Sequence, residues 1–210
     1  MLLVVTPTCS GERSPAMSKV VGVLAVQGDF REHIESLNQI EDVQARPVKT
    51  KEQIAQCDAL VIPGGESTTI GKLMERFGLD EPVRKMHEQG KPIWGTCAGM
   101  IILAKDIVES EQWRLGLMDI TVERNAFGRQ VDSFEVDLPV KGIDSGPVRA
   151  VFIRAPYVRA VREGCGVEVL GEVEGKIVLV RQGKLLASAF HPELTADRRV
   201  QRMFVEMIED

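Results

Sequence analysis

The first half of the chain alternates short, continuously apolar runs with stretches whose apolar residues recur at helical spacing. The runs at 20–26 and 59–62 are rich in Val, Ile and Leu, as expected of strands buried on both faces of a sheet. Between them, residues 29–40 place apolar side chains three or four positions apart, which predicts a helix. Further strands are expected at 43–48 and from Pro92 onward, and further helices at 51–56, 69–77 and 82–88. This alternation predicts an α/β fold with a doubly wound, mostly parallel sheet flanked by helices.

Beyond Leu103 the pattern changes to short strand-like runs separated by Gly, Pro and Asp. Residues 173–176, Val-Glu-Gly-Lys, have the composition of a tight hairpin turn. The chain then ends on residues 196–208, whose apolar positions predict a helix. The strands expected in this half are 120–123, 133–138, 148–153, 167–173, 176–180 and 185–189. They predict an additional antiparallel strand region in the C-terminal half of the fold.

The composition is that of an ordinary globular protein. Of the 210 residues, 44% are hydrophobic and 27% are charged, which excludes a disordered or collagen-like chain. No linker or internal repeat divides the sequence, so residues 17–210 are expected to form a single domain. Residues 1–16 precede a second methionine, Met17, and are expected to be a disordered extension.

Charge and hydropathy argue against two classes of partner. The net charge is −5 and there is no basic run, so the chain is poorly suited to displace counterions from nucleic acid. No stretch approaches the roughly 18 apolar residues that span a bilayer, and the start lacks the features of a signal peptide. We therefore expect a cytoplasmic protein that binds neither nucleic acid nor a membrane.

The four cysteines need separate explanations. Their spacing excludes zinc-binding and redox CxxC pairs, so no metal or other cofactor is expected. Cys57 and Cys165 are interpreted as structural residues, and Cys9 falls in the N-terminal extension. These cysteines are Cys9, Cys57, Cys97 and Cys165.

Cys97 has the context of a nucleophile. It lies in Gly-Thr-Cys-Ala-Gly at 95–99, between a strand-like run and an apolar helical segment. This is the nucleophile-elbow arrangement with sulfur in place of the serine oxygen. Small residues at Gly95 and Gly99 permit the sharp turn, and a position at a helix N-terminus favours a thiolate. The N–H of Ala98 then points to the space where a reacting carbonyl oxygen would lie.

His191 and Glu193 have the context of a base and its orienting carboxylate. His191-Pro192-Glu193 follows the apolar run that ends at Phe190, at the end of a strand where open α/β sheets bind ligands. A carboxylate two residues beyond the imidazole can fix its tautomer and stabilise its protonated form. The other histidines, His33 and His87, lie in polar helical patterns and are expected to be solvated.

A glycine pair ends another buried strand. At Gly64-Gly65 the backbone can approach a ligand closely, and Gly65 can supply a second N–H for an oxyanion. Ser67 or Thr68 is expected to cap the helix that follows.

Three of these segments, in this order, resemble the class I (triad) glutamine amidotransferases. They are Pro-Gly-Gly-Glu-Ser at 63–67, Gly-Thr-Cys-Ala-Gly at 95–99 and His-Pro-Glu at 191–193. Gly-Gly-Glu-Ser-Thr-Thr at 64–69, Arg-Asn-Ala-Phe-Gly-Arg-Gln at 124–130 and Phe-Ile-Arg-Ala-Pro at 152–156 are similar, more closely, to the glutaminase subunits of pyridoxal 5′-phosphate synthases. The resemblance runs from Val20 to the C-terminus and implies a flavodoxin-like class I amidotransferase fold.

The resemblance implies a role for each matching residue. Cys97 would attack the side-chain amide of L-glutamine to form a thioester, His191 would transfer protons and Glu193 would orient His191. The N–H groups of Gly65 and Ala98 would form the oxyanion hole. The glutamine pocket would be lined by Gly65, Glu66, Ser67, Arg124, Ile153 and Arg154.

The resemblance also implies a partner. The ammonia would pass to a synthase subunit, a (β/α)₈ barrel assembled into a large ring that carries the glutaminase subunits on its outside. Gln27 would lie near the oxyanion strand and respond to docking of that partner. Pyridoxal phosphate would be the product of the pathway and would not be bound here as a cofactor.

Two alternatives share part of this evidence. A glutaminase subunit of another ammonia-using synthase would have the same triad, and only the segments around Arg124 and Arg154 argue against it. A non-glutaminase α/β protein with an elbow cysteine, such as a redox sensor or chaperone, would not need the His-Pro-Glu segment.

Overall fold

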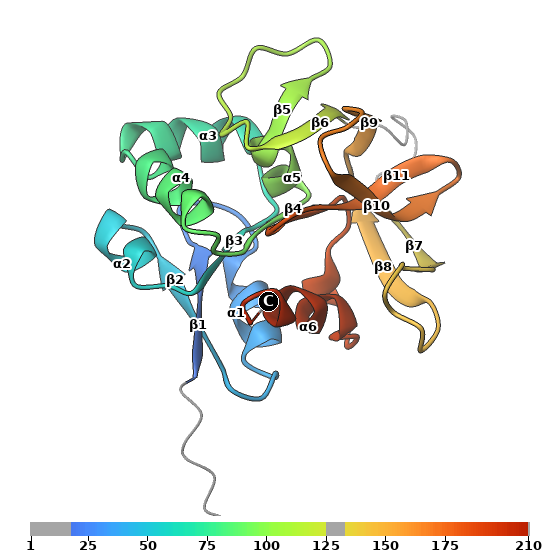
Figure 1. Cartoon of the computed structure of the whole chain (residues 1–210), viewed down its shortest axis with the longest axis horizontal. Coiled ribbons are helices and arrows are strands. Elements are labelled where there is room, and N and C mark those ends of the chain that lie inside the picture. Colours follow the sequence, from blue (N-terminus) through green and yellow to red (C-terminus); the bar gives the residue numbers. More distant parts are fainter. Residues whose placement is uncertain (1–17, 125–132, 210) are drawn as a thin grey trace, which may run out of the picture.

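The architecture is built on a ten-stranded sheet with helices on both faces (Figure 1). The structure, a computed structural model, describes residues 18–124 and 133–209. The expected extension at 1–16 and residues 125–130 of the Arg-Asn-Ala-Phe-Gly-Arg-Gln motif lie outside these ranges.

Five neighbouring strands of the sheet are parallel, in the order β2-β1-β3-β4-β12. This is the strand order of doubly wound, flavodoxin-like sheets, in which ligands bind at the carboxyl ends of the strands. All residues of β3, β4 and β12 are buried, which explains their continuously apolar sequences. The five strands are β1 (Lys19–Leu24), β2 (Val43–Val48), β3 (Ala59–Ile62), β4 (Ile93–Thr96) and β12 (Leu185–Ser188).

The helices lie on opposite sides of these strands, as the sequence predicts. In Figure 1, α1 (Phe30–Leu37) and α6 (Arg199–Glu206) lie on one side, while α3 (Ser67–Arg76), α4 (Asp80–Glu88) and α5 (Ala98–Leu103) lie on the other. The short α2 (Lys51–Ala55) packs against α4. No helix among the described residues is long and apolar enough to cross a membrane.

The C-terminal half extends the sheet with mostly antiparallel pairs. β11 (Lys176–Gln182) joins β12 and also pairs with β10 (Val167–Val173) and β9 (Tyr157–Val161). β9 continues to β6 (Met118–Glu123), and β5 (Ala104–Ile107) closes the edge as a parallel strand. The predicted antiparallel region is therefore confirmed, and Glu174 and Gly175 form its tight turn with φ of 50° and 73°.

Two of these strands are not predicted by the sequence patterns. β5 follows α5 without a loop, and its Ala-Lys-Asp-Ile sequence has little strand character. β9 meets β11 at a single residue pair and has a register shift against β6, so its residues do not alternate regularly between buried and exposed. In both strands, pairing with distant segments outweighs local preference.

A second, two-stranded sheet stands beside the main one. β7 (Ser133–Leu138) and β8 (Val148–Ile153) pair antiparallel, and the rings of Phe134 and Phe152 stack with centroids 4.6 Å apart. The backbone N–H of His191 donates to the carbonyl of Val151 at 2.8 Å, which joins this hairpin to the end of β12.

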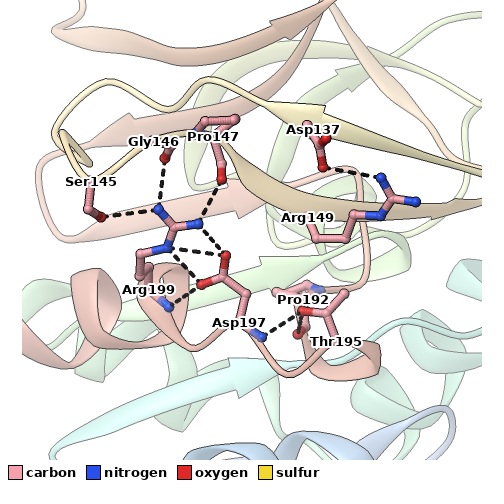
Figure 2. A network of polar contacts seen from close by, with 9 residues as sticks. All are labelled: Asp137, Ser145, Gly146, Pro147, Arg149, Pro192, Thr195, Asp197 and Arg199. Carbon is pink, nitrogen blue, oxygen red and sulfur yellow. Dashed lines mark hydrogen bonds and ion pairs between the residues drawn. The ribbon is translucent and has the colours of Figure 1, made fainter.

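Arg199 attaches the turn of this hairpin to the start of α6 (Figure 2). Its guanidinium donates to Ser145 Oγ and to the carbonyl oxygens of Gly146 and Pro147 at 2.7–3.1 Å. It also forms an ion pair with Asp197 at 2.6 Å. The N–H of Asp197 donates to Thr195 Oγ1, and this hydroxyl donates to the carbonyl of Pro192. These contacts connect β8 to η1 (Pro192–Leu194), a short 3₁₀ helix.

Trp94 fills the centre of the fold between the sheet and α6. Its side chain is fully buried, and its ring lies 5.3 Å from that of Phe204. The indole Nε1 donates to Ser188 Oγ at 3.1 Å, which links β4 to β12 through their side chains.

Replacing Trp94 with Phe is expected to lower the free energy of unfolding by about 1–3 kcal/mol, because it leaves a cavity and a buried hydroxyl without its donor. Urea unfolding of the whole chain measures this difference. Trp113→Phe is the matched control, since Trp113 is partly exposed and should cost less. Equal losses in the two variants would contradict the central role of Trp94.

Candidate active site

The residues of the site come together because their segments follow neighbouring parallel strands. Gly64 and Gly65 follow β3, Cys97 follows β4 and His191 lies shortly after β12. These strands lie side by side in the order β3-β4-β12, so their carboxyl ends meet at one edge of the sheet.

The elbow at Cys97 is a strained turn, as the sequence predicts. Cys97 has φ 48° and ψ −101°, a conformation that residues other than glycine rarely adopt. A Cβ on Gly95 would lie 2.4 Å from the backbone of Gly99, and a Cβ on Gly99 would lie 2.1 Å from the carbonyl oxygen of Ile62. The backbone therefore leaves no room for a side chain at either glycine.

His191 contacts both neighbours expected of it. Its Nδ1 lies 2.7 Å from Glu193 Oε1, and its ring interacts with Cys97, which lines the same cavity. Burial disfavours the charged imidazole, but the contacts with Cys97 and Glu193 outweigh burial and raise the pKa of His191 to about 10. A protonated His191 holds the proton that a leaving amine needs.

Glu193 lies behind His191, away from the pocket. Burial alone would raise the pKa of its carboxyl, but the facing His33 and His191 lower it. Glu193 is therefore an ionised group in a nearly dry environment, where its charge acts strongly on His191.

Cys97 and His191 open onto a cavity of about 490 Å³. Asp29, Ile101 and Pro156 also contribute to its wall, although none of them was predicted as a site residue. The lining includes Gln27 and every residue predicted for the glutamine pocket and the oxyanion hole: Gly65, Glu66, Ser67, Ala98, Arg124, Ile153 and Arg154.

The turn after β3 is held by Gln27. Its side-chain oxygen accepts the N–H of Glu66 at 2.8 Å, and a Cβ on Gly65 would lie 2.5 Å from the same oxygen. A side chain at Gly65 would therefore clash with Gln27, and the φ of 149° at this position also favours glycine.

The helix cap predicted at Ser67 or Thr68 is wrong. Glu66 caps α3 instead, because its carboxylate accepts the N–H groups of Thr68 and Thr69 at 3.2 and 2.7 Å. The hydroxyls of Ser67 and Thr68 both lie 3.3 Å from Oε1 of Gln112. The longer acidic side chain of Glu66 reaches these backbone donors, so the hydroxyls of Ser67 and Thr68 are free to contact Gln112, and Ser67 lines the cavity.

Two arginines supply positive charge to the cavity. Arg124 donates to Gln112 Oε1 at 3.0 Å and lies 3.8 Å from Glu66, so its guanidinium is held by the pocket wall. Arg154 directly follows β8, has a strained backbone with φ 42°, and lines the cavity. A guanidinium fork suits a substrate carboxylate.

The expectation that His33 is solvated is wrong. Its side chain is fully buried, with Nε2 3.0 Å from Thr96 Oγ1 and 3.3 Å from Glu193 Oε2. The sequence of α1 contains many charged residues, which led to the prediction of a solvated histidine. His33 nevertheless shares a helical face with Phe30 and Leu37, and this spacing could have indicated that it is buried. His87, also expected to be solvated, is partly buried, with its Nδ1 inaccessible to solvent.

One group of side chains among the described residues has the spacing of metal ligands. Asp29, His191 and Glu193 offer atoms within 4.8 Å of one another. The hydrogen bond between His191 Nδ1 and Glu193 Oε1 already occupies two of these atoms. The arrangement therefore suits a proton-transfer pair better than a metal ion.

A sequence model of the SNO glutamine amidotransferase family matches residues 23–210. The chain belongs to this family. The family assignment drawn from the motifs is thus confirmed, and the match covers all the site residues above.

Similar curated proteins are named as subunits of one enzyme. "Pyridoxal 5′-phosphate synthase subunit PdxT" of Desulforudis audaxviator (strain MP104C) is 59% identical over 191 residues, which are 90% of this chain and 98% of the relative. The protein of the same name from Carboxydothermus hydrogenoformans is 55% identical and covers 90% of this chain and 97% of its own length.

Two solved structures share the fold. A crystal structure of a glutamine amidotransferase is 55% identical, with a TM-score of 0.85 over 90% of this chain and 99% of its own. The structure of PurLQS from Thermotoga maritima, with a TM-score of 0.64 at 17% identity over 92% of this chain and 98% of its own, shows similarity of fold alone. The predicted amidotransferase fold is therefore confirmed.

The raised pKa of His191 predicts how stability depends on pH. The folded-state pKa of about 10 lies above the ordinary 6.5, so the stabilisation is fully present below pH 6.5 and is lost as the pH rises toward 10. Replacing His191 with Gln should remove this part of the pH dependence.

The measurement is urea unfolding of the wild type and the variant at several pH values, with the difference taken at each. Each unit of pKa shift corresponds to about 1.4 kcal/mol. A difference that stayed constant between pH 6.5 and 10 would contradict the predicted ion pair.

Proposed function

We propose that this chain hydrolyses L-glutamine to L-glutamate and ammonia, and that it delivers the ammonia to the synthase subunit of a pyridoxal 5′-phosphate synthase. The observation that carries the hydrolytic part is that Cys97 and His191 share the wall of a cavity, with Glu193 hydrogen-bonded to His191 behind it. Family membership and the names of the relatives support the choice of substrate and partner.

Substrate binding would use the charges of the cavity wall. The α-carboxylate of glutamine would pair with the Arg154 or Arg124 guanidinium, and Glu66 offers a carboxylate to the α-ammonium. The side-chain amide would then lie against Cys97, the cysteine of the cavity wall.

Hydrolysis would proceed through a thioester. The sulfur of Cys97 attacks the amide carbon, and the N–H groups of Gly65 and Ala98 stabilise the oxyanion. The imidazolium of His191 donates its proton to the departing nitrogen, which leaves as ammonia. His191 then takes a proton from water, and the resulting hydroxide attacks the thioester carbon. The C–S bond breaks, glutamate leaves, and Cys97 returns to a thiolate. Glu193 keeps the ring of His191 in one orientation throughout.

The synthase subunit would use the ammonia before it reaches bulk water. The relatives are named as subunits of pyridoxal 5′-phosphate synthase, and the proposed partner is its barrel subunit. We place the glutaminase subunits on the outside of a ring of such barrels in the cytoplasm. Gln27, which holds the turn at Gly65 and Glu66, gives partner docking a route to the oxyanion hole.

The two alternative functions have less support. A glutaminase serving another synthase would share the triad, but the relatives at 55–59% identity are named for pyridoxal 5′-phosphate synthase. A non-glutaminase elbow-cysteine protein would leave the charged cavity and the His191–Glu193 pair without a use.

Replacing Cys97 with Ala is expected to lower glutaminase activity by a factor of about 1000 or more, because no other group can form the thioester. The assay is glutamate release from glutamine, with and without the synthase subunit. The wild type should be faster with the partner present. Cys165→Ala is the matched control, because Cys165 does not line the cavity. Full activity of the Cys97 variant with its partner would refute the proposed chemistry.

Replacing Arg154 with Lys is expected to raise KM for glutamine about 10-fold and to change kcat less, because lysine keeps the charge but loses the fork that holds the α-carboxylate. Arg159→Lys, on the exposed side of β9, is the control. A change in kcat alone would argue against a binding role for Arg154.

A further inference from the structure

A buried histidine lies behind the proposed triad and has no part in the mechanism above. His33 comes from α1, on the opposite side of the sheet from the helix that Cys97 begins. Its side chain is fully buried, and the edge of its ring meets Trp94 at a centroid distance of 6.0 Å and an interplanar angle of 75°. The ring is therefore confined to one position.

Only one of its two ring nitrogens faces polar groups. Nε2 lies 3.0 Å from Thr96 Oγ1 and 3.3 Å from Glu193 Oε2. His33 Nδ1 and Glu193 Oε2 are both buried without a hydrogen-bond partner among the described residues, so the 3.3 Å approach of Nε2 to Oε2 is an electrostatic contact. Thr96 is the residue before Cys97, and Glu193 is the last member of the triad, so His33 touches both ends of the proposed catalytic machinery.

The geometry determines which nitrogen carries the proton. An ionised carboxylate only accepts hydrogen bonds. A lone pair on Nε2 facing Oε2 of Glu193 at 3.3 Å would therefore repel it. A proton on Nε2 removes this repulsion, because the N–H that bonds the Thr96 hydroxyl also brings its positive end close to Oε2. The unpartnered Nδ1 is then the nitrogen with the lone pair.

We propose that His33 is a positioning residue: its neutral imidazole, protonated on Nε2, holds Oε2 of Glu193 and so keeps Oε1 on Nδ1 of His191. The inference rests on the proposed glutaminase function, because positioning matters only if His191 transfers protons. Each oxygen of the carboxylate then faces a different imidazole, which opposes rotation of the carboxylate away from His191.

The charges around His33 are consistent with a neutral ring. Burial lowers its pKa, as does His191, while Glu193, Asp29 and Glu32 oppose this. These groups come from α1 itself, from the turn before it and from the segment after β12. A neutral His33 leaves the full negative charge of Glu193 to act on His191.

The first test replaces His33 by Gln and by Leu. Glutamine places an amide N–H at the same number of bonds from the backbone as Nε2, whereas leucine removes the donor. We expect His33→Gln to keep kcat within about 3-fold of the wild type, and His33→Leu to lower kcat about 10-fold. KM should change little, because His33 does not line the cavity. His87→Leu is the matched control on α4 and should be unaffected.

The second test measures which ring nitrogen of each histidine carries a proton. The chain has three histidines, so nitrogen NMR of the free full-length chain labelled in histidine resolves each ring. We expect His33 to be neutral with its proton on Nε2 at neutral pH. In His33→Leu the pKa of His191 should fall, and in His33→Gln it should stay near the wild-type value.

Three outcomes would overturn the proposal: a proton on Nδ1, a charged His33 at neutral pH, or equal losses of kcat in both variants with an unchanged titration of His191. The last would mean that His33 only fills space. If His33→Leu does not fold, the wild-type protonation pattern and His33→Gln still decide. A wild type that released no glutamate with its partner would refute the proposed function, and the protonation measurement separates that failure from this one.

Discussion

The structure depends on one strained turn, in which the backbone at Cys97 is held at positive φ between a buried strand and a buried helix. The strain persists because the surroundings leave no alternative. A Cβ on Gly95 would clash with the backbone of Gly99, and a Cβ on Gly99 would clash with the carbonyl of Ile62. The N–H of Cys97 donates to the carbonyl of Ser188 at 2.7 Å. The neighbouring strands β3 and β12 thus fix the nucleophile from both sides, so the order of the parallel strands is itself part of the site.

The second constraint is a buried negative charge. A carboxylate as buried as that of Glu193 is costly unless each oxygen has a donor or a compensating charge. His191 binds one oxygen and Nε2 of His33 lies 3.3 Å from the other, while Gln201 holds Pro192 between His191 and Glu193. The side chain of Gln201 is fully buried and donates to Ser36 Oγ on α1 and to the carbonyl of Pro192. Helices α1 and α6 therefore support the position of the triad as well as covering the sheet.

The sequence predicted those features whose cause is local. The elbow follows from small residues around Cys97, and the buried strands follow from continuous apolar runs, so both could be read directly. The role of His33 could not, because it depends on a contact with Glu193, 160 positions later in the chain. Strands β5 and β9 were missed for the same reason, since their partners, and not their own residues, make them strands. The grouping of Arg124, Gln112 and Ser67 likewise needed the three-dimensional structure.

The site divides along the same line as the fold. The proposed chemical groups follow the parallel strands, whereas Arg124, Ile153 and Arg154 come from the ends of β6 and β8 in the antiparallel region. The two parts meet along the β11–β12 strand pair, and the hydrogen bond from His191 to Val151 and the Arg199 network join the β7–β8 hairpin to the parallel part. In the proposed function the parallel part positions the reacting atoms and the antiparallel part binds the substrate, so sequence changes in the antiparallel region would alter substrate affinity while the proton-transfer geometry stays intact. Contacts with β8 are the exception, since a shift of this strand moves both Arg154 and the backbone of His191.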